Sequence, residues 1–498
     1  MDKFGEVYLD FSQNDINIDD LNLNTLWVEL DKGLLSDNIG QQSESIVKLT
    51  ELFDRYPLPV FVNSGFTRLA KVFQNGNNFL KLQIIRVIEK NQKHLTKIIN
   101  IEEILKLIFY NIHSNDAVCR ALTLRALGEI SPIISEKHNV QHSIRLALES
   151  SDETEAKEAF YAANKFCALS KYFSASLIDS ISAMIEAIHT PLSRKMRLVS
   201  LLVHMHHDTV LSSKASALCK SIYDSFARED TSKIILSTLT QIACKSLTNI
   251  PDTLTFYLKL LSEEPRQKIQ ISILKNLHIL ANKVAHLWTN DNISSLIEYI
   301  TKRIGYSNLV LKSSEILTEL AKNSSVFFLD LFKKQNEEKE EFKNLKKLIQ
   351  SLIFYEKQDI AFNFCILSTN LLLNANRYGH KTDQFEDFFE QTKNGLYSII
   401  IEIDEAIQNL DSMESDFQSN LAYFTKILPN ALKSSIDLIG MNDENYYKEL
   451  FEFVICLINS FRCKFIRIKI VVGSQEIKKA IICSKEGLNE HTYHSNDP

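Results

Sequence analysis

The stretch HSNDAVCRALTLRALGEI, His113–Ile130, contains a polar turn followed directly by an amphipathic segment. Ser114, Asn115 and Asp116 each carry a side-chain oxygen that can accept a hydrogen bond from a free N–H group at a helix N-terminus. Apolar residues then recur at three- and four-residue spacing, which is typical of one buried face of an α-helix. The stretch therefore predicts a capped helix that begins just after the polar turn.

Small residues mark the side of this helix that faces a neighbour. Ala117, Ala121 and Ala126 permit another helix to approach closely. Gly128 costs about 1 kcal/mol relative to alanine inside a helix, and close packing is the usual compensation. Pro132 cannot continue a regular helix and predicts its end within about a turn.

The same unit recurs along the chain. Polar turns followed by amphipathic helices have spacings of 39, 39, 37, 39, 38, 35 and 42 residues, near the short end of the period of HEAT and armadillo repeats. Other amphipathic segments lie between them, such as Asn100–Ile112 and Asn249–Leu261, so each repeat is predicted to be a helix pair. The eight turns are centred near Asp37, Gly76, Asn115, Asp152, Pro191, Glu229, Glu264 and Tyr306.

Composition agrees with an all-α fold. The 498 residues include only 12 glycines and 8 prolines, too few for the tight turns of a large β or α/β protein. We therefore expect a HEAT/armadillo-like solenoid, whose stacked repeats form one continuous core and an extended surface. The expected segments are 1–24, flexible; 25–330, the solenoid; 331–347, a charged helix or linker; 348–460, further helices; and 461–498, a divergent tail.

The repeat pattern weakens after about residue 330. Helices are expected to resume there, the first over Leu348–Asn376. The stretch RCKFIRIKIVV, Arg462–Val472, is rich in β-branched residues and partly alternates basic with apolar ones, which favours a short strand.

Motifs of catalysis and cofactor binding are missing from the sequence. No two glycines lie closer than seven residues, which excludes GxGxxG, Walker A and GxSxG motifs, and there is no HExxH. The eight cysteines form no CxxC pair and are expected to be buried small hydrophobes. The most apolar stretches, Ile360–Leu373 and Leu450–Phe461, are too short or too interrupted to span a bilayer. We expect neither an enzyme nor a cofactor, a small-molecule substrate or a membrane partner.

The stretch HMHHD, His204–Asp208, raises the question of a metal site. Zinc requires three or four ligands, and His204, His207 and Asp208 have no identifiable partner cluster. We expect instead a corner between two helices, with His204 over the last carbonyl groups of the first and Asp208 as the N-cap of the second. Metal binding and a pH-sensitive contact are the alternatives.

Two basic groups are candidate nucleic-acid contacts. Arg462, Lys464, Arg467 and Lys469 lie on the expected C-terminal strand, which is alternatively a plain surface strand, because Phe465 is its only aromatic residue. The net charge of −6 also argues against bulk attraction to nucleic acid.

A second basic group lies within the repeats. Arg120, Arg125 and Arg145, beside His142, can form a basic ridge or ion-pair ladders between neighbouring helices, and ladders are favoured.

Several ordered stretches resemble the Integrator complex subunit 7 family. They lie within residues 25–320 and include LWVELDKGLLSDNIGQQSESIVKL, IHSNDAVCRALTLRALGEISPII, LVHMHHDTVL and EEPRQKIQISILKNLHILANKVAHLW. Residues past about 330 match poorly, so the C-terminal half expected of the family is shortened or divergent here.

The resemblance implies an α-helical solenoid that acts as a non-catalytic scaffold in the nuclear Integrator complex. Such a scaffold has other Integrator subunits as partners and, indirectly, RNA polymerase II and nascent RNA. It supports small nuclear RNA 3′-end processing and transcription termination, with links to the DNA-damage response. The resemblance implies a location in the nucleus, and the cytoplasm is a further expected location. The alternatives are an importin-like or vesicle-coat-like transport adaptor and a direct nucleic-acid-binding repeat protein.

Overall fold

The computed structural model describes residues 18–226, 228–323, 340–353 and 358–377, together with five residues between 391 and 398. The chain divides into two compact units, residues 1–220 and 221–498. Helices make up the regular structure of the described residues, and no strand occurs among them. The strand expected over Arg462–Val472 lies outside the described residues.

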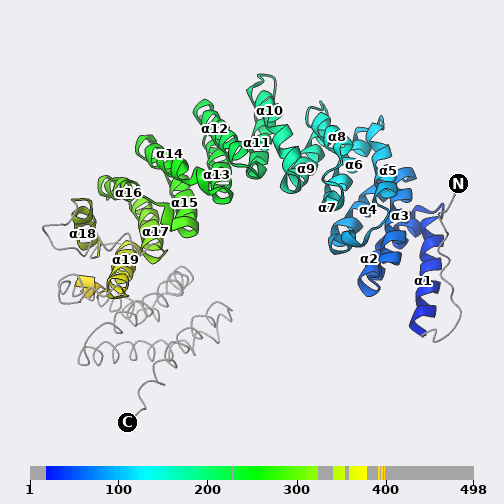
Figure 1. The fold of residues 1–498 in the computed structure, drawn as a ribbon, viewed down its shortest axis with the longest axis horizontal. Coiled ribbons are helices and arrows are strands. Elements are labelled where there is room, and N and C mark those ends of the chain that lie inside the picture. The colour runs from blue at the N-terminus through cyan, green and yellow to red at the C-terminus, as the bar shows by residue number, and fades with distance from the viewer. Residues whose placement is uncertain are drawn as a thin grey trace, which may run out of the picture. The chain divides into compact units, whose positions relative to one another are not determined.

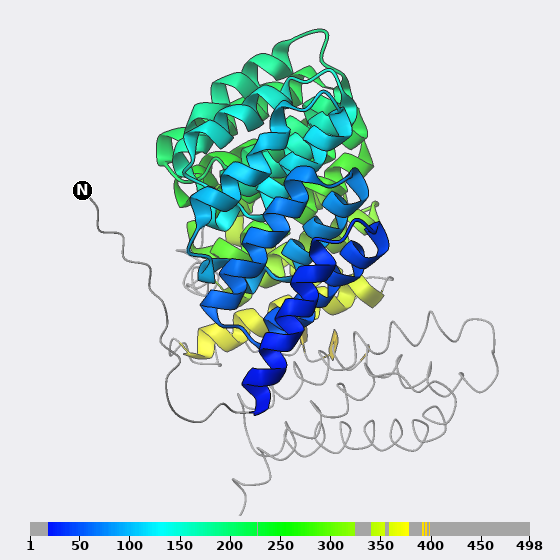
Figure 2. The same ribbon diagram turned by 90° about the vertical axis from the view of Figure 1, so that its right-hand side faces the viewer.

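The first unit consists of helix pairs that follow one another in chain order (Figure 1). Figure 2 views this unit from its N-terminal end, with α1 in dark blue at the front. Short 3₁₀ turns lie at 92–97, 110–113 and 202–204. The helices are α1 (Ile18–Leu34), α2 (Ile39–Arg55), α3 (Pro59–Asn75), α4 (Asn78–Lys90), α5 (Ile101–Phe109), α6 (Ala117–Glu129), α7 (Ser131–Ile134), α8 (His138–Leu148), α9 (Glu153–Leu169), α10 (Lys171–Glu186), α11 (Leu192–Leu201) and α12 (Thr209–Ser225), which extends past the boundary.

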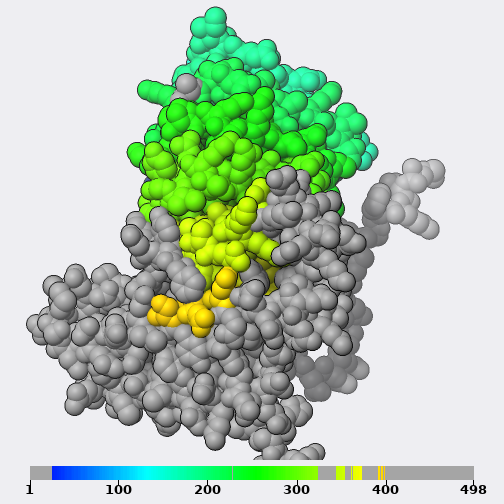
Figure 3. Space-filling view, turned by 90° about the vertical axis from the view of Figure 1, so that its left-hand side faces the viewer, coloured from blue at the N-terminus to red at the C-terminus, as the bar shows by residue number. Residues whose placement is uncertain are grey.

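The second unit repeats the arrangement. Its first helices pack in a row, α13 on α15, α15 on α17 and α17 on α19, while α14, α16 and α18 form a second row. Figure 3 shows the surface at the end of this unit, where green gives way to yellow towards α19. The helices are α13 (Glu229–Lys245), α14 (Ile250–Glu263), α15 (Gln267–Val284), α16 (Asn290–Lys302), α17 (Ser307–Asn323), α18 (Glu340–Leu352) and α19 (Gln358–Arg377).

All eight predicted repeat turns are confirmed, because a helix begins within three residues of each turn centre. In the first four repeats an Asn or Asp side chain caps this first helix. Asn38 accepts from the Gly40 N–H at 2.8 Å, and Asp116 accepts from the Val118 N–H at 2.9 Å. Of the three predicted capping residues Ser114, Asn115 and Asp116, it is thus Asp116 that caps α6. A cap of this kind contributes about 1 kcal/mol.

One core position recurs in every repeat. The residue just before each first helix is followed, eleven positions later, by an aliphatic residue or an alanine. This residue is at most 1% exposed in all eight repeats. Burying a leucine at such a position contributes about 1.5–3 kcal/mol. The eight residues are Leu49, Ile88, Leu127, Ala163, Leu202, Leu239, Leu277 and Leu317.

Two expected boundaries differ from the structure, and one division has no predicted counterpart. Helix α1 already begins at Ile18, inside the segment expected to be flexible. The single helix expected over Leu348–Asn376 is replaced by α18 and α19, which extend the two rows beyond residue 330. The division at residues 220 and 221 had no counterpart in the predicted segments, because the repeat spacing continues across it.

Gly128 packs closely, as its position within a helix predicts. A Cβ atom added there would lie 3.0 Å from the Tyr161 ring and 3.3 Å from the Cα atom of Ala162 on α9. The ring has little freedom to move, since the Arg125 guanidinium stacks on it at 3.6 Å and its hydroxyl donates to Glu129. The missing side chain therefore permits the contact between α6 and α9.

We predict that Gly128→Ala lowers the free energy of unfolding by about 1 kcal/mol. Overpacking typically costs about 1–3 kcal/mol, which outweighs the gain of about 1 kcal/mol in helix propensity. Urea unfolding measures this, with Gly305→Ala as the control, because no atom lies within 4 Å of a Cβ added at Gly305. A stabilised Gly128→Ala variant would contradict the packing argument.

Candidate interaction surfaces

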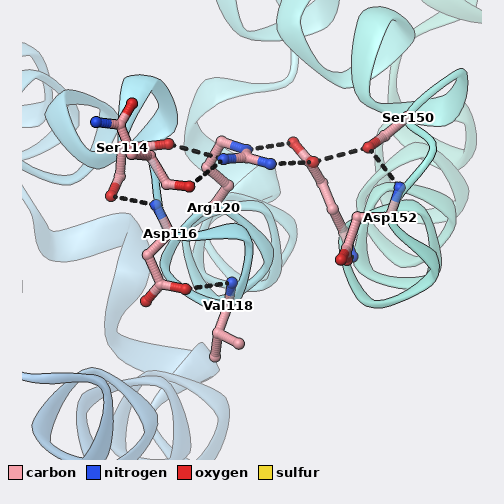
Figure 4. Close-up of polar contacts among 8 residues, drawn as sticks. Ser114, Asp116, Val118, Arg120, Ser150 and Asp152 are labelled. Atoms are coloured by element: carbon pink, nitrogen blue, oxygen red, sulfur yellow. Dashed lines mark hydrogen bonds and ion pairs between the residues drawn. The ribbon is translucent and has the colours of Figure 1, made fainter.

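Two of the basic residues within the repeats, Arg120 and Arg125, join neighbouring repeats, as the favoured prediction of ladders has it. Arg120 on α6 donates from Nε and a terminal nitrogen to the Glu155 carboxylate on α9, at 2.9 and 2.8 Å (Figure 4). Its other terminal nitrogen donates to the Ser114 carbonyl oxygen at 2.8 Å, and the Ser150 hydroxyl donates to Glu155 at 2.8 Å. The Glu155 side chain is only 10% exposed. Arg120 thus links the turn before α6 with Glu155 on α9, and Glu155 in turn contacts the turn before α9. We call such a contact between repeats a structural tie.

This bidentate contact changes the acidity of the carboxyl group. Hydrogen bonding to Arg120 lowers the pKa of Glu155, while burial acts in the opposite direction. The same contact raises the pKa of Arg120. The pair is therefore charged throughout the neutral range.

Arg125, one turn further along α6, is surrounded by carboxylates of three helices. Its guanidinium lies 3.3 Å from Glu129, 3.5 Å from Glu158 on α9 and 4.0 Å from Glu89 on α4. Burial, followed by the hydrogen bond to Glu129, raises the pKa of Tyr161, whose ring lies under the guanidinium. The positive charge of Arg125 is balanced within this cluster, which disfavours a phosphate contact there.

Arg145 takes no part in these ladders. It lies on α8 and donates to the ring Nδ1 of His142, three residues earlier on the same helix, at 3.1 Å. The preference for ladders over a basic ridge is therefore confirmed for Arg120 and Arg125 only.

The HMHHD stretch forms a corner, as predicted. It links the 3₁₀ turn after α11 to the start of α12. The Asp208 carbonyl accepts the Ser212 N–H at 2.9 Å, so Asp208 occupies the N-cap position. The His207 Nε2 donates to the carbonyl oxygen of Cys167 at 2.9 Å.

The expected role of His204 is wrong. Its Nε2 lies 2.6 Å from the Asn164 side-chain oxygen on α9, rather than over the carbonyl groups of α11. His204 and His207 each contact a residue 40 positions earlier, which is about one repeat. The two histidines therefore hold adjacent repeats together.

Metal and thiol chemistry find no support in the part of the chain that the structure describes. No group of three or more His, Cys, Asp or Glu side chains there is arranged to hold a metal ion. Burial raises the pKa of Cys167, Cys219 and Cys365 to about 12, so these thiols stay protonated at neutral pH. Cys119 is buried as well and Cys244 is half-buried. Cysteines 456, 463 and 483 lie outside the described residues.

Open grooves lie between neighbouring second helices within each unit. One, of about 660 Å³, runs between α5 and the start of α8 and is lined by Glu102, Phe109 and Tyr110, which is 67% exposed. Another, of about 490 Å³, lies between α14 and α16 and includes Thr255 and Glu298. Their mixture of charged, amide and apolar side chains suits protein contacts better than an enclosed ligand site.

The four basic residues predicted to contact nucleic acid, Arg462, Lys464, Arg467 and Lys469, lie outside the described residues. Among those that are described, no helix has the length and hydropathy needed to cross a membrane.

Comparison with known proteins links the chain to one family. A family model described as Integrator complex subunit 7, N-terminal, matches residues 27–472. Integrator complex subunit 7 of Homo sapiens is 36% identical over 357 residues, 72% of this chain and 37% of the relative. The Gallus gallus protein of that name is 40% identical over 302 residues, 61% of this chain and 31% of the relative. The chain thus aligns with about a third of the length of these curated relatives.

The family match extends further than the stretches that carry the resemblance. It continues to residue 472, beyond residues 25–320. The first two helices of that region, α18 and α19, extend the rows of the second unit, which gives the continued match a structural basis.

Solved structures share the fold at low identity. Kap121p bound to Nup53p has a TM-score of 0.56 and 11% identity, over 96% of this chain and 51% of that one. Kap121p bound to the C-terminus of the phosphatase Cdc14p has a TM-score of 0.55 and 10% identity, over 95% of this chain and 56% of that one. At this identity the likeness shows a helical-repeat fold alone.

We predict that Glu155→Gln lowers the free energy of unfolding by about 2 kcal/mol at pH 7, the usual contribution of a hydrogen bond to a charged group. The folded-state pKa of Glu155 lies below the unfolded value of about 4.3. The stabilisation is therefore present above that pH and is lost as the pH falls through the folded-state pKa.

Urea unfolding from pH 7 down to pH 3 measures this loss. The matched control is Glu263→Gln, whose 62% exposed carboxylate lies 4.0 Å from Lys259 and is expected to contribute little. Equal effects of the two substitutions at pH 7 would show that Glu155 is not a structural tie.

Proposed function

This chain belongs to the Integrator complex subunit 7 family, and from that membership we propose that it is a non-catalytic scaffold subunit of the nuclear Integrator complex. In this role it supports small nuclear RNA 3′-end processing and RNA polymerase II transcription termination. It does so by contacts with other Integrator subunits, and it reaches the polymerase and the nascent RNA through them.

The observation that carries the proposal is the family match over residues 27–472, which includes every described helix from α2 to α19. The polar side chains that first suggest chemistry support a scaffold role, because they tie repeats together. Arg120 and Arg125 neutralise carboxylates of adjacent helices, and His207 holds a backbone carbonyl group. What the repeats offer to other molecules is an extended surface with open grooves.

A transport adaptor is the competing function from another class. The likeness to Kap121p supports the fold, but identity of 10–11% carries no function from that protein to this one. A direct nucleic-acid contact through Arg462, Lys464, Arg467 and Lys469 is a further proposal, and its expected signature is affinity that falls steeply with salt.

We predict that the tagged chain, purified from nuclear extract, recovers other Integrator subunits, as quantified by mass spectrometry. A tagged helical-repeat protein of similar size from another family serves as the control. Recovery of transport receptors or coat proteins in place of Integrator subunits would contradict the proposal.

A further inference from the structure

Three lysines repeat at the same place in successive first helices of the second unit. Lys245, Lys283 and Lys322 lie in the last turns of α13, α15 and α17, and they are 38 and 39 residues apart. All three side chains are exposed. Because α13 packs on α15 and α15 on α17, the three last turns lie along one edge of the unit, here called the lysine row.

None of the three lysines of the lysine row forms an ion pair with a described carboxylate. Burial, followed by the positive charge of Lys283, lowers the pKa of Lys245. Other lysines of the unit do have acidic partners, namely Lys233 with Glu229, Lys259 with Glu263 and Lys302 with Glu298.

The corresponding edge of the first unit contains a carboxylate. Lys93, just after α4, pairs with Asp54 in the last turn of α2 at 2.7 Å, and His94 lies 3.4 Å from the same carboxylate. Hydrogen bonds to Lys93 and His94 lower the pKa of Asp54. The first unit also carries exposed basic residues in the last turns of its first helices, Arg55 on α2 and Lys90 on α4, neither of which forms an ion pair with a described residue. The difference at this edge is the Asp54 carboxylate beside the basic residues of the first unit.

Helix dipoles explain only part of the lysine row. A lysine in the last turn offsets the partial charge of about −0.5 at a helix C-terminus. Three full positive charges exceed three such partial charges, so the edge keeps a net positive potential. Relief of the repulsion between Lys245 and Lys283 further favours a bound anionic group.

Aliphatic side chains accompany these charges. Ile279, one turn before Lys283 on α15, is 49% exposed, and Leu247, two residues after Lys245, is 58% exposed. Single-stranded nucleic acid is usually held by aromatic side chains on which bases stack. Aliphatic side chains beside lysines match a peptide that presents both carboxylates and apolar groups.

We propose that the lysine row, with Ile279 and Leu247, is a docking site for an acidic segment of a partner protein in which aspartate or glutamate residues alternate with aliphatic ones. The carboxylates pair with Lys245, Lys283 and Lys322, and the aliphatic side chains cover Ile279 and Leu247. This assignment rests on the proposed scaffold function, since it specifies one surface by which the scaffold holds a partner.

The test uses the purified full chain and a fluorescein-labelled peptide built of glutamate pairs separated by leucine, followed by fluorescence anisotropy. We expect binding that weakens with added salt, and none to a matched peptide with glutamine in place of glutamate. The triple variant Lys245→Gln, Lys283→Gln and Lys322→Gln is expected to weaken binding by roughly tenfold or more, since three partly exposed charge pairs are lost. The matched control is Lys233→Gln, Lys259→Gln and Lys302→Gln, which removes the same charge from paired lysines and is expected to leave binding unchanged.

Two further arms identify the ligand class. Ile279→Ser is expected to weaken binding of the leucine peptide but not of an alanine-substituted one. A single-stranded RNA of equal charge that binds as tightly as the peptide, with the same lysine dependence, would overturn the assignment in favour of nucleic acid. Equal loss in both triple variants would overturn it as well. Because these assays need no other subunit, their failure is distinguishable from a failure of the chain to co-purify with Integrator.

Discussion

The fold depends on one constraint: a helix pair in this chain cannot bury its apolar face without the next pair. The recurring core residue of the first helices, Leu127 in α6 for example, is fully buried only because a neighbouring repeat covers it. Polar ties between residues about one repeat apart align the stack. Asn78 donates to Asp116 at 2.7 Å, 38 residues further on, and Arg120 reaches Glu155, 35 residues further on.

This constraint decides what the notable polar residues do. Groups that elsewhere serve as ligands or catalysts are used here in contacts between repeats, since a buried polar group must find a partner. Arg125 lies among three carboxylates, and His204 and His207 reach back to α9. Lys245, Lys283 and Lys322 are among the groups that the stack leaves without an ion pair in the described part of the second unit.

Much of the architecture could be predicted from local sequence, because caps and apolar spacing are local signals. Asp116 and Gly128 show this, since both act as their positions in the repeat predict. Partners across repeats could not be predicted, since spacing alone does not say which residue of the neighbouring helix lies opposite. The role of His204 was missed for that reason. A search for charged residues at equal repeat positions would have found Lys245, Lys283 and Lys322.

The most direct test of the scaffold account is amide hydrogen exchange of the free chain and of the chain assembled with its partners. The account predicts slow exchange in the buried first helices of both units already in the free chain. Assembly is then expected to add protection only at surface segments and helix ends, because the stack itself provides the core. Rapid exchange throughout the first helices of the free chain would contradict it, since the repeats would then require partners in order to fold.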